Sequence, residues 1–258
     1  MGISSWFVSA FTNPILLAGT ATNIALAAAG EIPTYIVCYE TIYLLSLVTL
    51  GGTGCTLPLN VMMMRSKSTR LKTLGSICIA PSIFNINEPL VFGTPIVFNP
   101  LLMIPMWINS LVTPILIWVV MSLGWLAVPA ASVTTGQIPA PIGYIMVTGD
   151  FRAILFWALT FALTWAIWFP FFKVYERQVI AQEAEEAEAK LKEAKDSITE
   201  AHNGQTEVIQ AEMRGEETKI SLLFIHAQDT IMTITNEINM ATEMLEMYKL
   251  IHGKGGQA

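Results

Sequence analysis

Charged side chains are scarce in this sequence, making up 13% of its 258 residues where an average soluble domain has about 25%. Because apolar residues reach 53%, a single water-soluble fold is disfavoured. The three cysteines, Cys38, Cys55 and Cys78, form no Cys-x-x-Cys or Cys/His pattern, which excludes a disulfide scaffold and favours buried thiols. The net charge of −6, with no basic patch interleaved with aromatic residues, disfavours nucleic-acid binding.

The few charges are unevenly distributed along the chain. Residues 1–172 contain nine charged side chains, whereas residues 173–258 contain 25. All 13 prolines and all seven tryptophans also lie in the first part. The sequence therefore joins an apolar part to an acidic, polar part near Lys173.

No Lys or Arg precedes the small residues at 25–29, so we expect no cleaved signal peptide there.

The apolar part contains runs long enough to cross a membrane. A spanning helix needs about 20 apolar residues, and residues 101–123 and 151–172 meet that requirement. Residues 3–29 and 35–50 are further candidate spans, although the second is short. The positive-inside rule places the basic loop 65–72 and the residues after 172 on the cytoplasmic side, so an even number of crossings must separate them.

Two other apolar segments are too interrupted to form spanning helices. Residues 74–100 contain four prolines, and residues 125–149 combine prolines with glycine. Broken backbone at membrane depth is tolerated where it is buried in protein or lines a watery cavity, as in transporter binding sites. We therefore expect an all-α fold: a polytopic helical membrane domain with re-entrant broken helices. The alternative is that these segments are loops on the membrane surface.

The first broken segment contains FNINEP, residues 84–89. Glu88 is the only Asp, Glu, Lys, Arg or His between positions 73 and 149, and such a residue at membrane depth indicates a functional site. A carboxylate can accept a proton from a hydroxyl group. Asn85 and Asn87 add amides that donate and accept hydrogen bonds, as sugar hydroxyls require. The pattern predicts binding of a polar solute, and the alternative is an Asn/Glu cap on a half-helix.

The acidic part predicts a pair of long helices. Residues 178–213 are rich in helix formers, and Arg214-Gly215 is a typical helix end. From Glu217 we expect a second helix, whose apolar residues follow a heptad spacing: Ile220, Phe224, Ala227, Ile231, Ile234, Ile238, Ala241, Leu245 and Tyr248. A short turn makes the pair an antiparallel hairpin. Two helices enclose no core, so further helices must come from a partner or from other copies.

His226 is the histidine that we single out in this hairpin. It lies beside the heptad positions, in the segment HAQD, with Asp229 one turn away on the same face. Such a histidine is either structural or a reactive or ligating imidazole, and one His and one Asp are too few ligands for a structural zinc site. His202 and His252 have no comparable neighbours, and we interpret both as solvated.

These segments resemble two components of one pathway. The apolar part resembles the membrane (IIC) component of the lactose/cellobiose family of the bacterial phosphoenolpyruvate-dependent sugar phosphotransferase system. The segments that carry this resemblance are FNINEPLVFG, TPIVFNPLLMIP, NPILLAGTATNIA, TGDFRA and FPFFKVYERQ. EAHNGQTEVIQAE and SLLFIHAQDTIMT resemble its IIA component. The resemblance implies a partial IIC-like domain over residues 1–178, matching the C-terminal half of the family. It also implies an IIA-like domain without its first helix over residues 179–253, and a disordered tail over 254–258.

The resemblance also implies functions for particular residues. Glu88 would contact the sugar hydroxyl that is phosphorylated, supported by Asn87, and His226 would be the phosphohistidine that HPr charges. Asp229 would gather around a divalent cation, Mg²⁺, on the axis of an IIA oligomer, and no organic cofactor is expected. A separate IIB protein would transfer the phosphoryl group to a β-linked disaccharide of the cellobiose or lactose type. The chain would lie in the bacterial inner membrane with a cytoplasmic C-terminal tail.

Two other functional classes remain open. The family's His-Gly motif is not found before Ile3, so the chain is also compatible with a truncated, membrane-anchored helical interaction module that transports nothing. An ion-coupled secondary transporter is a third possibility, although a single carboxylate without intramembrane His or Lys offers little for coupling. Phosphotransferase activity is therefore expected only together with an IIB protein and the rest of an IIC domain.

Overall fold

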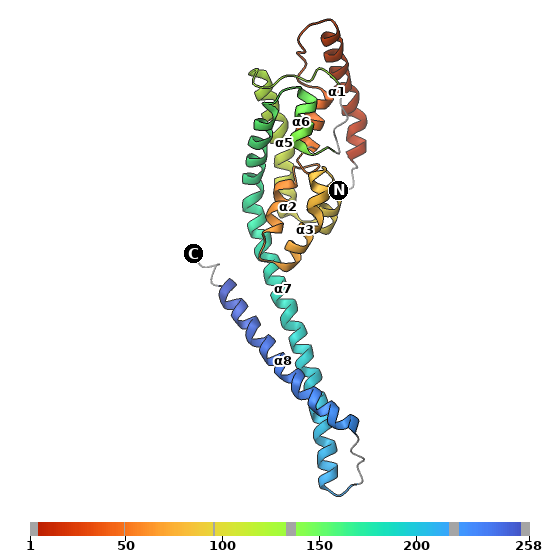
Figure 1. The fold of residues 1–258 in the computed structure, drawn as a ribbon, viewed down its shortest axis with the longest axis vertical. Coiled ribbons are helices and arrows are strands. Elements are labelled where there is room, and N and C mark those ends of the chain that lie inside the picture. The colour runs from red at the N-terminus through yellow and green to blue at the C-terminus, as the bar shows by residue number, and fades with distance from the viewer. Residues whose placement is uncertain (1–4, 49, 95, 133–137, 217–221, 254–258) are drawn as a thin grey trace. The chain divides into compact units, whose positions relative to one another are not determined.

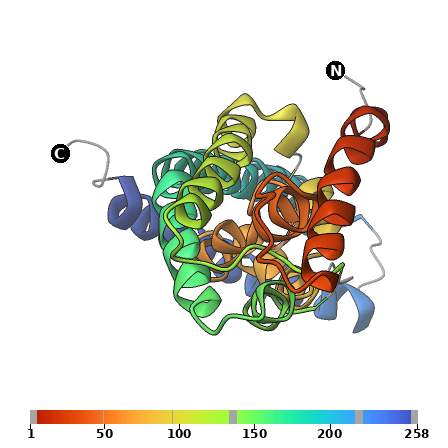
Figure 2. The same ribbon diagram turned by 90° about the horizontal axis from the view of Figure 1, so that it is seen from above.

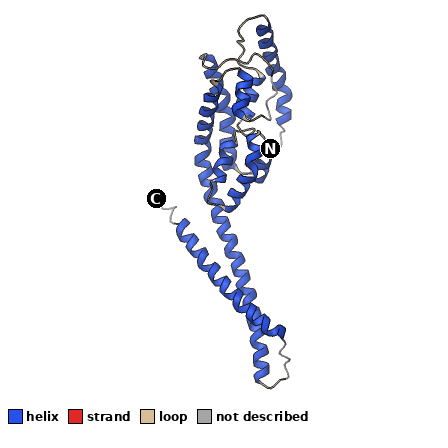
Figure 3. Ribbon diagram, viewed as in Figure 1, coloured by secondary structure: helices blue, strands red, loops and turns tan. Residues whose placement is uncertain are grey.

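The computed structural model describes residues 5–48, 50–94, 96–132, 138–216 and 222–253. The regular elements in these ranges are all helical, as the all-α prediction requires (Figure 3). The chain divides into two compact units, residues 1–177 and 178–258. The predicted disordered tail over 254–258 and the predicted start of the second tail helix at Glu217 lie outside the described residues.

The first unit contains helices of very different lengths (Figures 1 and 2). In chain order they are α1 (Ser5–Ala28), the π-helix η1 (Glu40–Val48), α2 (Leu57–Met64), α3 (Thr69–Ile83), α4 (Glu88–Gly93), the 3-10 helix η2 (Ile96–Phe98), α5 (Pro100–Ser122), α6 (Ala140–Thr148) and α7 (Ala153–Met213), which continues into the second unit. Among the described helices, α5 and α7 are long and apolar enough to cross a membrane. They correspond to the two clear spans expected from the sequence.

The two segments expected to be broken are broken. Residues 74–100 are divided among α3, α4 and η2, and the only regular helix described between residues 125 and 149 is the nine-residue α6. The candidate span over residues 35–50 is wrong as a continuous crossing, because its helix is the nine-residue π-helix η1. Gly51 and Gly52 follow at φ +84° and +86°, a left-handed conformation that α-helices do not contain. The predicted span over residues 3–29 is helical as α1, but α1 is not one of the two described helices that are apolar enough to cross a membrane, so its crossing stays a prediction.

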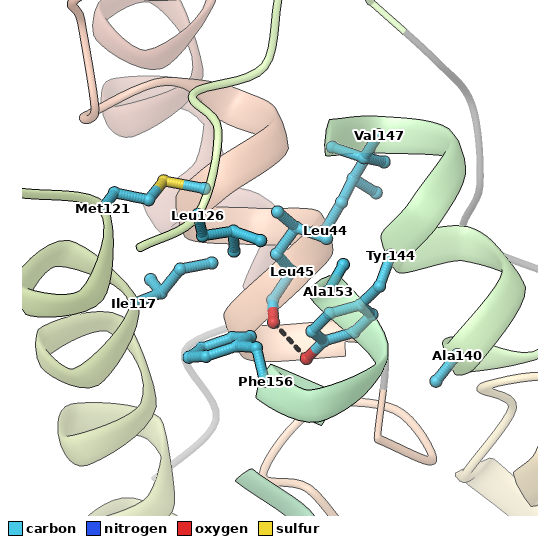
Figure 4. Close-up of a cluster of buried hydrophobic side chains, with 10 residues drawn as sticks. All are labelled: Leu44, Leu45, Ile117, Met121, Leu126, Ala140, Tyr144, Val147, Ala153 and Phe156. Atoms are coloured by element: carbon cyan, nitrogen blue, oxygen red, sulfur yellow. Dashed lines mark hydrogen bonds between the residues drawn. The ribbon is translucent and has the colours of Figure 1, made fainter. Parts of the chain in front are cut away.

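A buried apolar cluster holds the short helices against the long ones (Figure 4). It joins η1, α5, α6 and the start of α7 through Leu44, Leu45, Ile117, Met121, Leu126, Ala140, Tyr144, Val147, Ala153 and Phe156. The Tyr144 hydroxyl donates a hydrogen bond to the Leu45 carbonyl, so the polar end of this ring is satisfied within the cluster. Apolar packing and this hydrogen bond together fix α6 on η1.

The second unit is an antiparallel helical hairpin, as predicted, made of α7 from Gln178 onward and α8 (Leu222–Gly253). An ion pair joins the two helices of the hairpin. It links Glu188, near the start of the first helix, to Lys249, near the C-terminal end of α8. Gly215, at φ +79°, lies just beyond the end of α7, and its N–H bonds to the Glu212 carbonyl. α7 itself is one helix of 61 residues, without a break at the compositional boundary near Lys173.

The contact face of α8 differs in part from the predicted heptad positions. Phe224, Ile231, Ile238, Leu245 and Tyr248 are buried or half-buried as expected. Ala227 and Ile234 are exposed, while Gln228 and Thr235 lie on the less exposed side. The difference arises because a single partner helix covers a narrower face than the seam of a bundle does.

Candidate functional site

The NINEP segment forms a tight turn between two helices of the first unit. The α3 helix ends at Ile83 with Phe84 as its C-cap, and the Ile86 N–H bonds back to the Pro81 carbonyl at 3.0 Å. Asn85 adopts φ +63°, a left-handed conformation that asparagine tolerates better than most residues. Glu88 is the first residue of α4, and Pro89 occupies an early helical position where a missing N–H costs nothing. The turn therefore fixes the direction in which residues 85–88 are presented.

Both asparagines hold this turn against a second loop. The Asn85 amide donates to the Ile138 carbonyl at 2.9 Å, and its Oδ1 accepts from the Gly51 N–H at 3.2 Å. The Asn87 amide donates to the Thr53 carbonyl at 2.9 Å. Both side chains are buried. These hydrogen bonds connect the turn to backbone groups far away in sequence, so the two asparagines position the site, and their predicted contacts with a sugar remain a prediction.

The second loop, GGTG at residues 51–54, was not identified as a site element from the sequence. Its three glycines have φ values of +84°, +86° and +86°. A Cβ atom on Gly52 would lie 2.5 Å from Cγ of Asn87, and one on Gly54 would lie 2.4 Å from Cγ of Met106. The three closely spaced glycines are the sequence feature that points to such a loop. They allow the backbone to approach the NINEP turn more closely than any side chain would permit.

Glu88 differs from Asn85 and Asn87 in that its side chain is exposed. The turn that buries Asn85 and Asn87 therefore leaves the carboxylate open to a ligand. The Glu88 side chain, which the sequence places at membrane depth, lies at a surface of the described chain. A carboxylate whose backbone is fixed by a tight turn can accept a hydrogen bond or a proton from a hydroxyl group.

His226 and Asp229 lie one turn apart on α8 in the second unit, and both are exposed. The backbone carbonyls of these residues accept hydrogen bonds from Thr230 and Thr233, whose hydroxyls bond within the helix. An exposed imidazole on a stable helix is accessible to a protein donor or acceptor. Across the described residues, no group of three or more His, Cys, Asp or Glu side chains is placed to hold a metal ion.

Two buried carboxylates of the first unit, Glu40 and Glu176, were not predicted from the sequence as residues of structural importance. Glu40, at the start of η1, accepts a hydrogen bond from the Thr20 hydroxyl at 2.5 Å. Glu176, on α7, accepts from the Ser66 hydroxyl at 2.6 Å, from the Lys67 N–H at 3.1 Å and from Lys173 Nζ at 2.7 Å. Burial opposes ionisation of Glu176, but these hydrogen bonds and the Lys173 charge outweigh it and lower its pKa. Both carboxylates anchor one element to another.

Comparison with known families gives two matches along the chain. A family described as "Phosphotransferase system, EIIC" matches residues 1–110, and "PTS system, Lactose/Cellobiose specific IIA subunit" matches residues 177–249. The transporter ChbC, the IIC component from the N,N'-diacetylchitobiose-specific phosphotransferase system, superimposes with a TM-score of 0.65 at 34% sequence identity. That superposition covers 68% of this chain and 41% of ChbC.

Curated relatives agree with these matches. The lichenan permease IIC component of Bacillus subtilis is 37% identical over 166 residues, which are 63% of this chain and 36% of the relative. The cellobiose-specific EIIC component of Geobacillus stearothermophilus is 39% identical over 138 residues, or 53% of this chain and 31% of the relative. The chain spans between 29 and 45% of the length of the curated relatives it matches.

The helical first unit, its NINEP turn and these matches define a helical domain of the phosphotransferase-system EIIC type. Within that class, the chain carries a partial EIIC domain of the lactose/cellobiose family and a PTS IIA domain at its C-terminus. Membership in this family places the chain in the cell membrane.

Proposed function

We propose that this chain takes part in the uptake of a β-linked disaccharide, of the cellobiose or lactose type, and in its concomitant phosphorylation. The observation that carries this proposal is the set of hydrogen bonds between the NINEP turn and the GGTG loop, which bury Asn85 and Asn87 and leave Glu88 exposed beside them. The names of the relatives, which include cellobiose-, lactose- and N,N'-diacetylchitobiose-specific components, support a sugar of this kind.

In this proposal Glu88 accepts the proton of the sugar hydroxyl that attacks phosphorus. The phosphoryl group comes from a separate IIB protein, and its bond to that protein breaks as the bond to the sugar oxygen forms. Asn85 and Asn87 keep the turn rigid, so that the carboxylate is already oriented before the sugar arrives. The broken segments around the site would then be re-entrant elements of a multi-pass domain in the inner membrane.

His226 is the proposed phosphoryl acceptor in the second unit. Its imidazole attacks the phosphorus of phosphorylated HPr, the bond to HPr breaks, and the group then passes to the IIB protein. We place this IIA-like domain over residues 179–253, on the cytoplasmic side of the membrane. Asp229 supplies a single carboxylate per copy, so a Mg²⁺ site would need carboxylates from other copies of a homo-oligomer.

Two measurements test the two halves of this proposal separately. The purified full chain, incubated with phosphoenolpyruvate carrying labelled phosphate and the general phosphotransferase proteins, should take up label. His226→Ala should abolish it, whereas His202→Ala, another exposed histidine of the same unit, should not. Binding of cellobiose or lactose to the purified chain in detergent should be lost in Glu88→Gln and retained in Glu183→Gln. Label surviving in His226→Ala, or sugar binding surviving in Glu88→Gln, would contradict the respective half.

A membrane-anchored helical interaction module is the second candidate. The observation that favours it is the number of exposed apolar side chains on the hairpin, among them Met232, Met240, Met244, Met247 and Leu250. Exposed apolar residues in such number are typical of a helix that pairs with further helices. This candidate predicts self-association without any dependence on sugar or phosphate, and sugar binding that requires Glu88 would exclude it.

A further inference from the structure

Six basic side chains gather at one end of the first unit. We call this group the basic patch. It consists of Arg65, Lys67, Arg70, Lys72, Lys173 and Arg177, all of them exposed. Arg65 caps the end of α2, Arg70 and Lys72 lie in the first turn of α3, and Lys173 and Arg177 lie one turn apart on α7. The two sequence segments of the patch, 65–72 and 173–177, contain one carboxylate, Glu176.

Glu176 brings the two segments of the patch together. Its carboxylate accepts from the Ser66 hydroxyl at 2.6 Å and from the Lys67 N–H at 3.1 Å, and therefore fixes the loop between α2 and α3 against α7. Arg70 lies near enough to α7 for its charge to oppose the burial that raises the pKa of Tyr175. Glu176 is 5% exposed and pairs with the Lys173 ammonium at 2.7 Å, so its negative charge is matched within the protein while Arg65, Lys67, Arg70, Lys72 and Arg177 remain exposed.

Exposed apolar surface adjoins the basic patch on both helices. On α7, Phe169 and Val174 are each 46% exposed, and the Lys173 ammonium lies 5.9 Å and 5.7 Å from the ring centres of Phe169 and Phe172. On α3, Ile77 is 66% exposed, two turns beyond the basic first turn. The cations therefore lie where the apolar stretch of α7 ends, a place where basic side chains meet lipid headgroups.

We propose that the basic patch is a binding site for the headgroup of an anionic phospholipid. The phosphate would contact the exposed cations of the patch, while the acyl chains would cover the neighbouring apolar side chains of α3 and α7. A soluble acidic protein or free phosphate would match the charges but would leave that apolar surface uncovered. The proposal requires only that the chain lies in a membrane, so it stands or fails independently of sugar transport by Glu88 and His226.

The test compares lipids that differ only in headgroup charge. The full chain, purified in detergent, is mixed with equimolar phosphatidylglycerol and phosphatidylcholine of identical acyl chains, and bound lipid is counted by native mass spectrometry. We expect the chain to retain phosphatidylglycerol in preference. Each basic side chain near an anionic surface contributes roughly a fivefold factor in affinity. The triple variant Lys67→Gln, Arg70→Gln, Lys72→Gln should therefore lose most of the preference.

A matched variant controls for the loss of charge itself. Lys190→Gln, Lys192→Gln, Lys195→Gln removes three exposed cations from the second unit and should keep the wild-type preference. Raising the ionic strength should weaken the preference of the wild-type chain, a readout that requires no variant. The proposal is overturned if the wild-type chain retains both lipids equally, or if the 67/70/72 variant keeps the preference. It is equally overturned if inorganic phosphate at matched ionic strength displaces the lipid, or if an acidic soluble protein binds at the patch while phosphatidylglycerol does not.

Discussion

The side-chain amide of Asn87 donates a hydrogen bond to the backbone carbonyl of Thr53, 34 positions earlier in the chain, at 2.9 Å. This contact, together with that between Asn85 and Gly51, joins the NINEP turn to the GGTG loop. The exposed Glu88 follows directly after Asn87. The backbone position of Glu88 therefore depends on Asn87, whose side chain is buried.

Replacing Asn87 should separate positioning from ligand contact. Asn87→Ala removes the buried amide that donates to the Thr53 carbonyl, which should cost about 0.5–1.5 kcal/mol of stability and weaken sugar binding indirectly. Glu88→Gln alters an exposed side chain and should leave stability within about 0.5 kcal/mol of wild type while abolishing sugar binding. Thermal unfolding in detergent and sugar titration on both variants check this. Equal stability of the two variants would contradict the positioning role.

The GGTG loop should tolerate no added side chain at Gly52. In Gly52→Ala the left-handed backbone costs about 1–2 kcal/mol, and the new Cβ also collides with Asn87 Cγ. Gly30→Ala is the matched control, because Gly30 has φ +78° but nothing within 4 Å of an added Cβ. We expect a clearly larger fall in the unfolding temperature for Gly52→Ala, together with loss of sugar binding. Similar losses in the two variants would show that backbone strain alone accounts for the effect.

The Glu176 anchor should make the stability of the first unit dependent on pH. Its pKa is lower in the folded chain than its ordinary value of 4.5, so its contribution is fully present above that value and disappears as the pH falls below it. Glu176→Gln should therefore be less stable than wild type near neutral pH, by about 1–3 kcal/mol. The difference should shrink in acid. Unfolding midpoints across this pH range, with exposed Glu193→Gln on the same helix as control, would test the sign.

The hydroxyl of Tyr144 should contribute measurably to the packing of α6 on η1. Tyr144→Phe keeps the ring in the apolar cluster of Figure 4 but removes the donor to the Leu45 carbonyl, which should cost about 1 kcal/mol. Tyr35→Phe, at a side chain that is 54% exposed, should cost less. Denaturant or thermal unfolding compares the two, and a larger effect at Tyr35 would refute the assignment.

Composition and breaker residues predicted much of the helical plan. Apolar runs identified α5 and the first part of α7, and the prolines between residues 74 and 100 correctly indicated broken structure. The span predicted over 35–50 failed because apolar composition alone does not reveal how few of those residues continue as a helix before Gly51. Periodicity also misplaced Ala227 and Ile234, since a heptad pattern describes a seam shared by several helices, whereas one helix covers a narrower face.

The candidate site was harder to predict, because its defining contacts are long-range. The sequence pointed to Glu88, Asn85 and Asn87 as polar residues in an apolar segment. It did not reveal that the asparagines bond to Gly51, Thr53 and Ile138, up to 53 positions away. Glu40 and Glu176 were missed for a related reason: their partners, Thr20 and Ser66, are short hydroxyl residues that no local pattern marks as hydrogen-bond donors to a distant carboxylate.

The bond from Asn85 to the Ile138 carbonyl has a consequence for biosynthesis. A chain emerges from the ribosome in order, so residues 51–54 and 84–88 are both made well before residue 138. The NINEP turn can contact the GGTG loop early in translation, but its last backbone acceptor arrives only once α5 and the segment after it have been synthesised. The hydrogen bonds of the candidate site can therefore be completed only after residue 138 has been made, and a nascent chain arrested earlier would lack one of them.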